Sequence, residues 1–182
     1  MDFSEWARQI EKERREKDES FIINPDSPIP PESRFRFEGL RYYPPDFDYR
    51  FELDLHEHKE KKSLEVEDSS GQNRQLINWG EFRFKIDHRE FVIQVYKNNP
   101  ETERLFIPFR DTTNGDQTYG AGRYLDILPG RDRTAEGKWI LDFNKAYNPF
   151  CAYNKSYACS LIPSENYLEL PIPAGEKNAQ DS

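Results

Sequence analysis

The spacing of hydrophobic residues near the start of the chain is helical. The apolar residues of this segment recur at intervals of three and four: Phe3, Trp6, Ala7 and Ile10. Such spacing places them on one face of a helix. Asp2, followed three residues later by Glu5, also matches a pair of residues that often caps a helix N-terminus. We therefore expect a helix over residues 3–20.

The second half of this helix is expected to be a solvated arm. The hydrophobic stripe stops at Ile10, and residues 11–17 are all charged. Within this run Glu11 and Arg15 lie four residues apart, an order that stabilises a helix by about 0.2–0.5 kcal/mol. Neutralising several of these charges should therefore cost under about 1 kcal/mol. A partner-binding role for this helix is the alternative.

Beyond a proline-rich connection, the hydrophobic period changes to two. Phe51, Leu53 and Leu55 alternate with polar residues, as in a strand with one buried face. Residues 81–96 alternate in the same way on both sides of a polar turn, which predicts a hairpin. Further strands are expected at residues 63–67, 73–79, 104–109, 122–128, 138–144 and 167–172. This series of short strands predicts a mainly β fold, an antiparallel sandwich or open barrel, with an N-terminal α-helix.

The chain is expected to fold as a single domain. Its 182 residues are enough for one hydrophobic core. Residues 1–24 are assigned to the N-terminal helix and arm, 25–177 to a single β-rich domain, and 178–182 to a disordered tail. The polar stretch that begins at Ala174 is expected to fray.

Composition and charge exclude several classes of protein. Although 33% of residues are charged, the chain has 13 Phe, 10 Tyr and 3 Trp, which argues for a packed core rather than disorder. The net charge of −8 argues against a nucleic-acid partner. No apolar stretch approaches the roughly 18 residues of a membrane span, so no membrane partner is expected. An acidic N-terminus and two cysteines predict a cytoplasmic protein with free thiols; the oligomeric state stays open.

Residues that often bind metals occur without a complete site. His56 and His58 have the spacing that would place both on one face of a strand. The lysine-rich stretch after them resembles a loop, however, and a solvated turn is the better interpretation. Cys151 and Cys159 are too far apart in sequence for a zinc knuckle. We therefore expect no metal, and the sequence leaves any other cofactor unknown.

The most polar, glycine-rich part of the second half is the segment 110–124. Gly120 and Gly122 permit backbone conformations that other residues avoid. One interpretation is a long hairpin loop that is pinned by a pair between Asp111 and Arg123. The other is a loop that faces a ligand, with Arg123 binding an anion.

A second polar segment follows at 139–153. The period of two predicts that Asp142 and Asn144 project from one face of a strand. A buried Asp142 would need a nearby cation, and Arg123 is the expected one. We therefore predict that Arg123 and Asp142 lie in one site, with Asp111, Tyr119 and Asn144 close to them.

Several motifs together resemble the family catalogued as domain of unknown function 1684. They lie at residues 30–31, 37–40, 43–45, 79–82, 110–115, 118–125, 141–153, 159–166 and 174–177. The chain is similar to the short form of the family, with Ser160 and Phe150 where proline is common. The resemblance implies no assigned activity, and it places the family's polar signature in segments 110–124 and 142–166.

Two functions of different classes remain. The first is a small-molecule-binding β domain, or an enzyme of unknown reaction, with a polar pocket formed by these two segments. Polar groups among aromatic rings are typical of such pockets. The residues expected to bind the ligand are Asp111, Tyr119, Arg123, Asp142, Asn144, Tyr147 and Asn148. The alternative is a non-catalytic structural or interaction module in which these residues form an internal hydrogen-bond network.

Overall fold

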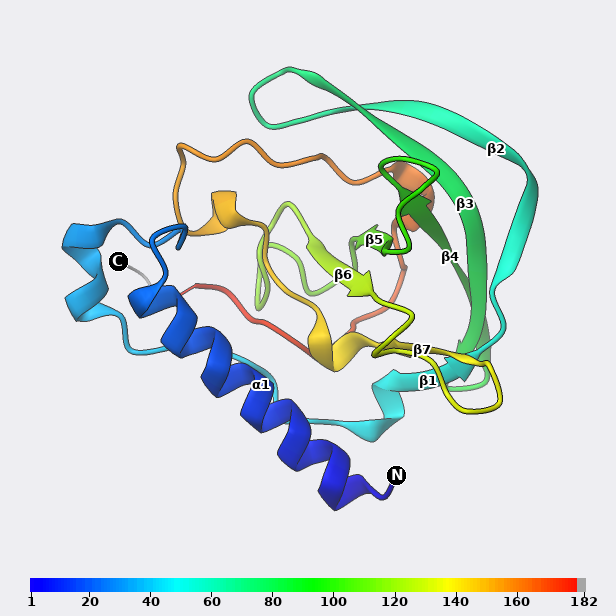
Figure 1. Ribbon diagram of the computed structural model, residues 1–182, viewed down its shortest axis with the longest axis horizontal. Helices are drawn as coiled ribbons and strands as arrows, with labels where there is room; N and C mark the ends of the chain where they lie inside the picture. Colours follow the sequence, from blue (N-terminus) through cyan, green and yellow to red (C-terminus); the bar gives the residue numbers. More distant parts are fainter. Residues whose placement is uncertain (180–182) are drawn as a thin grey trace.

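A computed structural model of the chain describes residues 1–179 (Figure 1). Over these residues the helix α1 (Phe3–Ile23) is followed by strands and short 3-10 turns. The strands are β1 (Arg50–Leu53), β2 (His56–Glu67), β3 (Asn73–Ile86), β4 (Arg89–Lys97), β5 (Leu105–Phe109), β6 (Arg123–Ile127) and β7 (Trp139–Asp142). No helix of the described chain is both long and apolar enough to cross a membrane.

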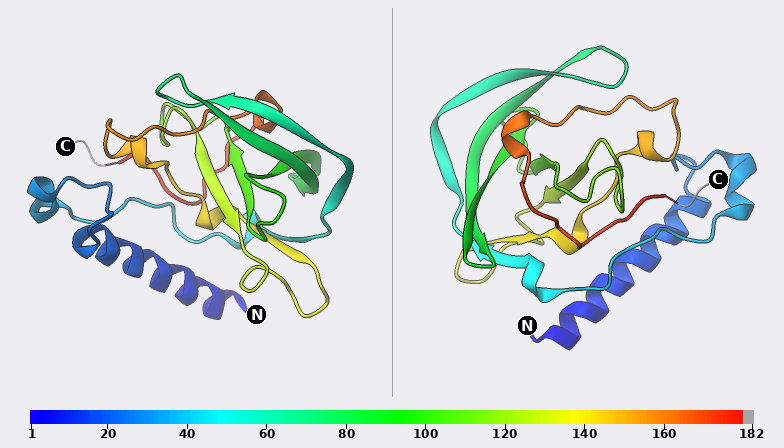
Figure 2. Two further views of the ribbon diagram at one scale, coloured as in Figure 1. Left: turned by 45° about the horizontal axis from the view of Figure 1, so that its top comes forward. Right: turned by 180° about the vertical axis from the view of Figure 1, so that it is seen from behind.

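The strands form two antiparallel sheets. Five strands pair in the order β2-β3-β4-β5-β6, so each strand lies beside its neighbour in sequence, and β1 pairs with β7 in a two-stranded sheet. The long strands β2 and β3 curve around one side of the molecule, and α1 lies on the opposite side (Figures 1 and 2). The sheets do not close into a barrel. The prediction of a mainly β fold with an N-terminal helix is confirmed.

The hairpin predicted at residues 81–96 is present as β3 and β4. Its register runs from Ile86, opposite Arg89, to Ile77, opposite Lys97. The connecting residues Asp87 and His88 have φ values of 49° and 65°, as the two-residue turns of twisted hairpins require.

The main core lies between the concave face of the larger sheet and the segments that cross it. Phe82, Ile93, Ile107, Leu141 and Phe143 are each 0% exposed. Aromatic rings pack against one another there, such as Phe109 and Phe143, which meet edge to face at a centroid distance of 5.3 Å. The abundance of aromatic residues therefore does build a core, as expected.

Some predicted elements differ from the structure. His56 and His58 do not lie in a turn but begin the edge strand β2. Residues 167–172 form no strand; Tyr167 makes a single bridge to Arg110. The strand predicted at 138–144 ends at Asp142, because the Asp142 carboxylate accepts from the amide of Asn144 and caps a 3-10 turn there.

The second half of α1 is not a solvated arm. Arg14 is 8% exposed and continues the stripe of Trp6 and Ile10, in which each member follows the previous one by four positions. Arg14 Nη1 donates to the Tyr43 main-chain oxygen at 2.9 Å. The expectation was wrong because an arginine can bury its aliphatic stem while its guanidinium finds main-chain acceptors.

The stretch from Ala174 does not fray. Ala174 and Glu176 are both 0% exposed. The amide of Glu176 donates to the oxygen of Ala146, and Asn178 donates to the oxygen of Gln117. Asn178, the first residue of the tail that was expected to be disordered, is therefore bonded to the protein, and residues 180–182 of that tail lie outside the described part. The polar composition of this stretch did not indicate that the Glu176 carboxylate would be buried.

Candidate functional site

Asp111 and Arg123 form a buried ion pair at the base of the loop between β5 and β6. Arg123 Nη2 donates to Asp111 Oδ2 at 2.7 Å, and both side chains are 0% exposed. Arg123 also donates to the main-chain oxygens of Ile172, Ala174 and Glu176. Burial lowers the pKa of Arg123, and the Asp111 carboxylate partly offsets that effect. The pair thus pins the loop, as one of the two interpretations predicted, and no guanidinium surface is left accessible to a ligand.

Glu176 connects this pair with another predicted residue. Its main-chain oxygen accepts from Arg123, and its carboxylate accepts from the amide of Asn148 and from Lys17 Nζ at 3.0 Å. Asn148 is 1% exposed and donates its side-chain amide to Tyr153. Arg123 and Asn148 therefore belong to one internal network that ties the C-terminal segment to the sheet.

Asp142 and Arg123 do not form a pair, so the prediction that Arg123 is the cation beside Asp142 was wrong. Its carboxylate accepts from Trp6 Nε1 at 2.9 Å and from the Asn144 side chain, also at 2.9 Å. Arg123 instead pairs with Asp111. The strand ends at Asp142, so the carboxylate turns toward α1 rather than projecting from the sheet.

Tyr119 lies beside the two cysteines. Its hydroxyl is 3.7 Å from Cys151 Sγ, and the Cys151 amide donates to Cys159 Sγ at 3.3 Å. Both thiols are free in the structure and are half-buried. Burial, together with Cys151, raises the pKa of Tyr119 to about 12 and that of Cys159 to about 11.

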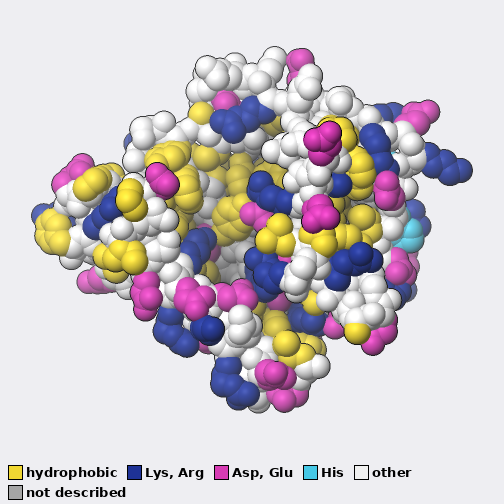
Figure 3. Space-filling view, in the orientation of Figure 1, with side chains coloured by type: hydrophobic (Ala, Val, Ile, Leu, Met, Phe, Trp, Pro, Cys, Tyr) yellow, Lys and Arg dark blue, Asp and Glu magenta, His cyan; other side chains and the backbone are white. Residues whose placement is uncertain are grey.

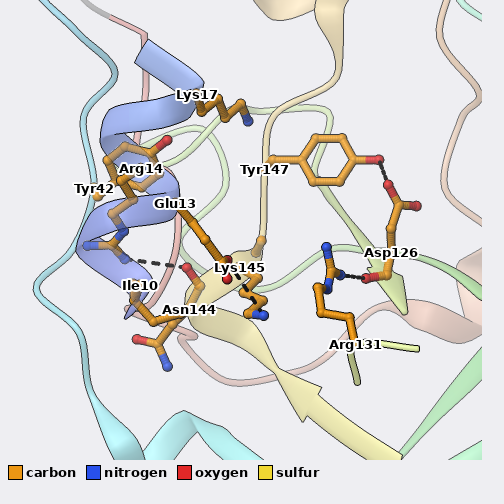
Figure 4. A pocket seen from close by; sticks show the side chains of 11 residues that line it. Ile10, Glu13, Arg14, Lys17, Tyr42, Asp126, Arg131, Asn144, Lys145 and Tyr147 are labelled. Carbon is orange, nitrogen blue, oxygen red and sulfur yellow. Dashed lines mark hydrogen bonds and ion pairs between the residues drawn. The ribbon is translucent and has the colours of Figure 1, made fainter. Parts of the chain in front are cut away.

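The face seen in Figure 3 is hollowed, with hydrophobic side chains around the hollow and Lys and Arg on its rim. One cavity on this side of the molecule, here called the helix cleft, has a volume of about 220 Å³. It lies between α1 and Tyr147, whose hydroxyl donates to Asp126 at 2.7 Å (Figure 4). Its other lining residues are Ile10, Glu13, Arg14, Lys17, Tyr42, Arg131, Asn144, Lys145 and Ala146. Of the seven predicted residues, Asn144 and Tyr147 line this cleft.

Tyr147 also lines a second cavity, here called the aromatic pocket. Its volume is about 420 Å³, and most of its surface is apolar. Five aromatic rings line it: Phe106, Tyr124, Tyr147, Phe150 and Tyr157. Its polar groups include two arginines, Arg74 and Arg104. Burial and the hydrogen-bonded Asp126 raise the pKa of Tyr147, so its hydroxyl stays protonated.

Part of the lining of these cavities could be predicted from the sequence. Segment 142–166 supplies one wall of the aromatic pocket, from Tyr147 to Ser160. Sequence reasoning did not identify three residues that shape these sites: Arg14, Asp126 and Glu176. Glu176 lies in a motif that resembles the family, which was a usable signal, whereas Arg14 and Asp126 carried none. Among residues 1–179 no group of three or more His, Cys, Asp or Glu side chains is arranged to hold a metal ion.

Comparisons with known proteins agree with the resemblance seen in the sequence. A family model described as "Protein of unknown function (DUF1684)" matches residues 35–177. The solution NMR structure of the uncharacterised protein from gene locus rrnAC0354 of Haloarcula marismortui is similar, with a TM-score of 0.72 and 38% sequence identity. The similarity covers 96% of this chain and 95% of that one. No curated protein matches.

Proposed function

We propose that this chain, which belongs to the DUF1684 family, binds a small organic molecule in the aromatic pocket. The observation that carries the proposal is a cavity of about 420 Å³ that five aromatic rings line. Ligand pockets of proteins typically have about 300–1,000 Å³ and are lined by apolar and aromatic side chains with a few polar groups. A ligand with a flat, apolar body fits this lining.

The polar groups of the pocket are placed to orient such a ligand. Arg104 is held by two hydrogen bonds to Asp126, and the same carboxylate accepts from Tyr147. Because its neighbours fix Arg104, its guanidinium plane is pre-organised for a ligand. Tyr124 donates its hydroxyl to the Ser160 main-chain oxygen, which secures the opposite wall.

Some of the residues predicted to bind a ligand have a structural role instead. Asp111, Arg123 and Asn148 are buried and bonded to the protein, so we assign them to an internal network that positions the loops. Tyr147 remains the candidate for direct ligand contact. The reaction class, if there is one, stays open, and a reducing cytoplasm suits the pair of free thiols.

Native mass spectrometry of protein purified from its own host tests the proposal. We expect an added mass on the wild-type chain that Ala158→Trp removes, because Ala158 lines the aromatic pocket and an indole there fills part of it. Ala135→Trp is the matched control, since Ala135 is exposed on another part of the chain. A spectrum of unliganded protein alone, or an added mass that Ala158→Trp retains, contradicts the proposal.

A further inference from the structure

The helix cleft contains buried hydrogen-bond donors that the protein does not use. The Tyr42 hydroxyl and Arg14 Nε are both buried, and neither has a hydrogen-bond partner within the described residues. The side chain of Arg14 is only 9% exposed. Buried polar groups in proteins are almost always satisfied, so two orphan donors in the lining of one cavity need an explanation.

Two ammonium groups add further donors to the same cavity. Lys17 and Lys145 extend into the space between α1 and Tyr147 (Figure 4). Lys145 Nζ is 3.5 Å from Asp132 and 3.6 Å from Glu13. Charge-assisted hydrogen bonds are usually about 2.7–2.9 Å long, so these ion pairs are loose. An ammonium also has three donors, and Lys17 places one of them on Glu176.

The carboxylates of the cavity, in contrast, each accept at least one hydrogen bond from the protein. Asp126 accepts from Arg104 and Tyr147, and Glu13 accepts from Gln9. Nearby carboxylates balance the charges of the lysines, so the cleft is not strongly positive. Two of its buried donors, the Tyr42 hydroxyl and Arg14 Nε, lack an acceptor within the described residues. A ligand that completes it must therefore bring several oxygen acceptors.

We propose that the helix cleft binds a small oxyanion, a carboxylate or phosphate group, through Tyr42, Arg14, Lys17 and Lys145. The cavity of about 220 Å³ is too small for a large ligand but holds a free anion or the acidic group of a larger one. The Lys17 ammonium lies over the Tyr147 ring, 5.0 Å from its centroid, so the anion would sit beside the side chain shared with the aromatic pocket. This site does not depend on the occupancy of that pocket.

Amide chemical-shift titrations with inorganic phosphate and with acetate, at constant ionic strength, test this site. We expect saturable shifts for residues of the helix cleft with at least one of the two anions. Phenyl phosphate distinguishes the sources: shifts confined to the cleft indicate a free anion, and shifts that extend into the aromatic pocket indicate the head group of a larger ligand. Both patterns support the site, and the absence of saturation with every anion overturns it.

The decisive variant is Tyr42→Phe, which removes one oxygen that has no protein partner in residues 1–179. The variant should fold with undiminished stability and bind the anion about tenfold more weakly, the effect of one lost hydrogen bond to a charged group. Lys17→Gln should also weaken binding, whereas Lys12→Gln, on the exposed face of the same helix, should not. Unchanged affinity in Tyr42→Phe and Lys17→Gln overturns the proposal. Inorganic phosphate has no apolar body, so its titration tests the helix cleft without testing whether the aromatic pocket binds an organic molecule.

Discussion

Asp111 and Arg123 both lose their hydration when the chain folds, and each compensates the charge of the other. Removing one partner of such a pair leaves an isolated buried charge, which typically costs 3–5 kcal/mol. We therefore expect Arg123→Met to lower the free energy of unfolding by about 3–5 kcal/mol, measured by chemical denaturation.

The control for this variant is Lys138→Met. Lys138 pairs with Asp54 on the surface, where the two side chains are 44% and 67% exposed. The loss there should stay below about 1 kcal/mol. If Arg123→Met also costs less than that, the internal network is not structural, and Arg123 returns to the candidates for ligand binding.

The two cysteines give a prediction on reactivity. Cys159 is half-buried beside Cys151, and burial raises its pKa to about 11. Since the thiolate is the reactive form, the Cys159 thiol should alkylate slowly at neutral pH and faster as the pH rises toward that value. Mass spectrometry of native protein after timed alkylation measures this. Protection of both thiols in denatured protein until a reductant is added would instead indicate a disulfide.

At the scale of elements, α1 is the clearest case of a partly predictable structure. Its N-terminal cap at Asp2 and the docking of Trp6 and Ile10 followed from the residue pattern. The docking of Arg14 did not, because hydrophobic periodicity counts arginine as polar. The acceptors of its guanidinium are the main-chain oxygens of Tyr43 and Asn144, and main-chain positions are invisible in a one-dimensional pattern.

Adjacent arginines on α1 allow a matched test of this contact. Arg14 is buried, whereas Arg15 is exposed. Arg14→Met should lower the free energy of unfolding by about 2–3 kcal/mol, because two main-chain acceptors lose their charged donor. Arg15→Met should change it by less than about 0.5 kcal/mol. Denaturation curves that are equal for the two variants would mean that the second half of α1 is a solvated arm after all.

The loop between β5 and β6 shows which part of a candidate site could be predicted. The pair of Asp111 with Arg123 followed from a hairpin whose ends meet. The predicted partner of Asp142 was wrong because the predicted strand continued to residue 144, whereas β7 ends at Asp142. The period of two was therefore applied to two residues beyond the end of the strand. The carboxylate itself ends the strand by capping the next turn, a local competition that the alternating pattern hides.

At the scale of the molecule, the class of fold was predictable and the arrangement of its irregular segments was not. Hydrophobic and polar residues alternate along β3 and β4 because each strand has one buried face, so these strands can be predicted from local sequence alone. The C-terminal stretch forms no strand, yet it supplies three oxygens to Arg123 and a buried carboxylate at Glu176. Long-range contacts of irregular chain depend on the assembled fold, so the cavities beside Tyr147 could not be located from residue spacing alone.

The most direct test of the account is to map where small molecules bind. A fragment library screened by amide chemical shifts should give saturable shifts around the aromatic pocket, in residues 147–160, and these shifts should be lost in Ala158→Trp but kept in Ala135→Trp. The buried pair of Asp111 and Arg123 should stay unperturbed. Hits that shift the loop 111–119 and leave residues 147–160 unchanged, or a library without any saturable hit, would contradict the account.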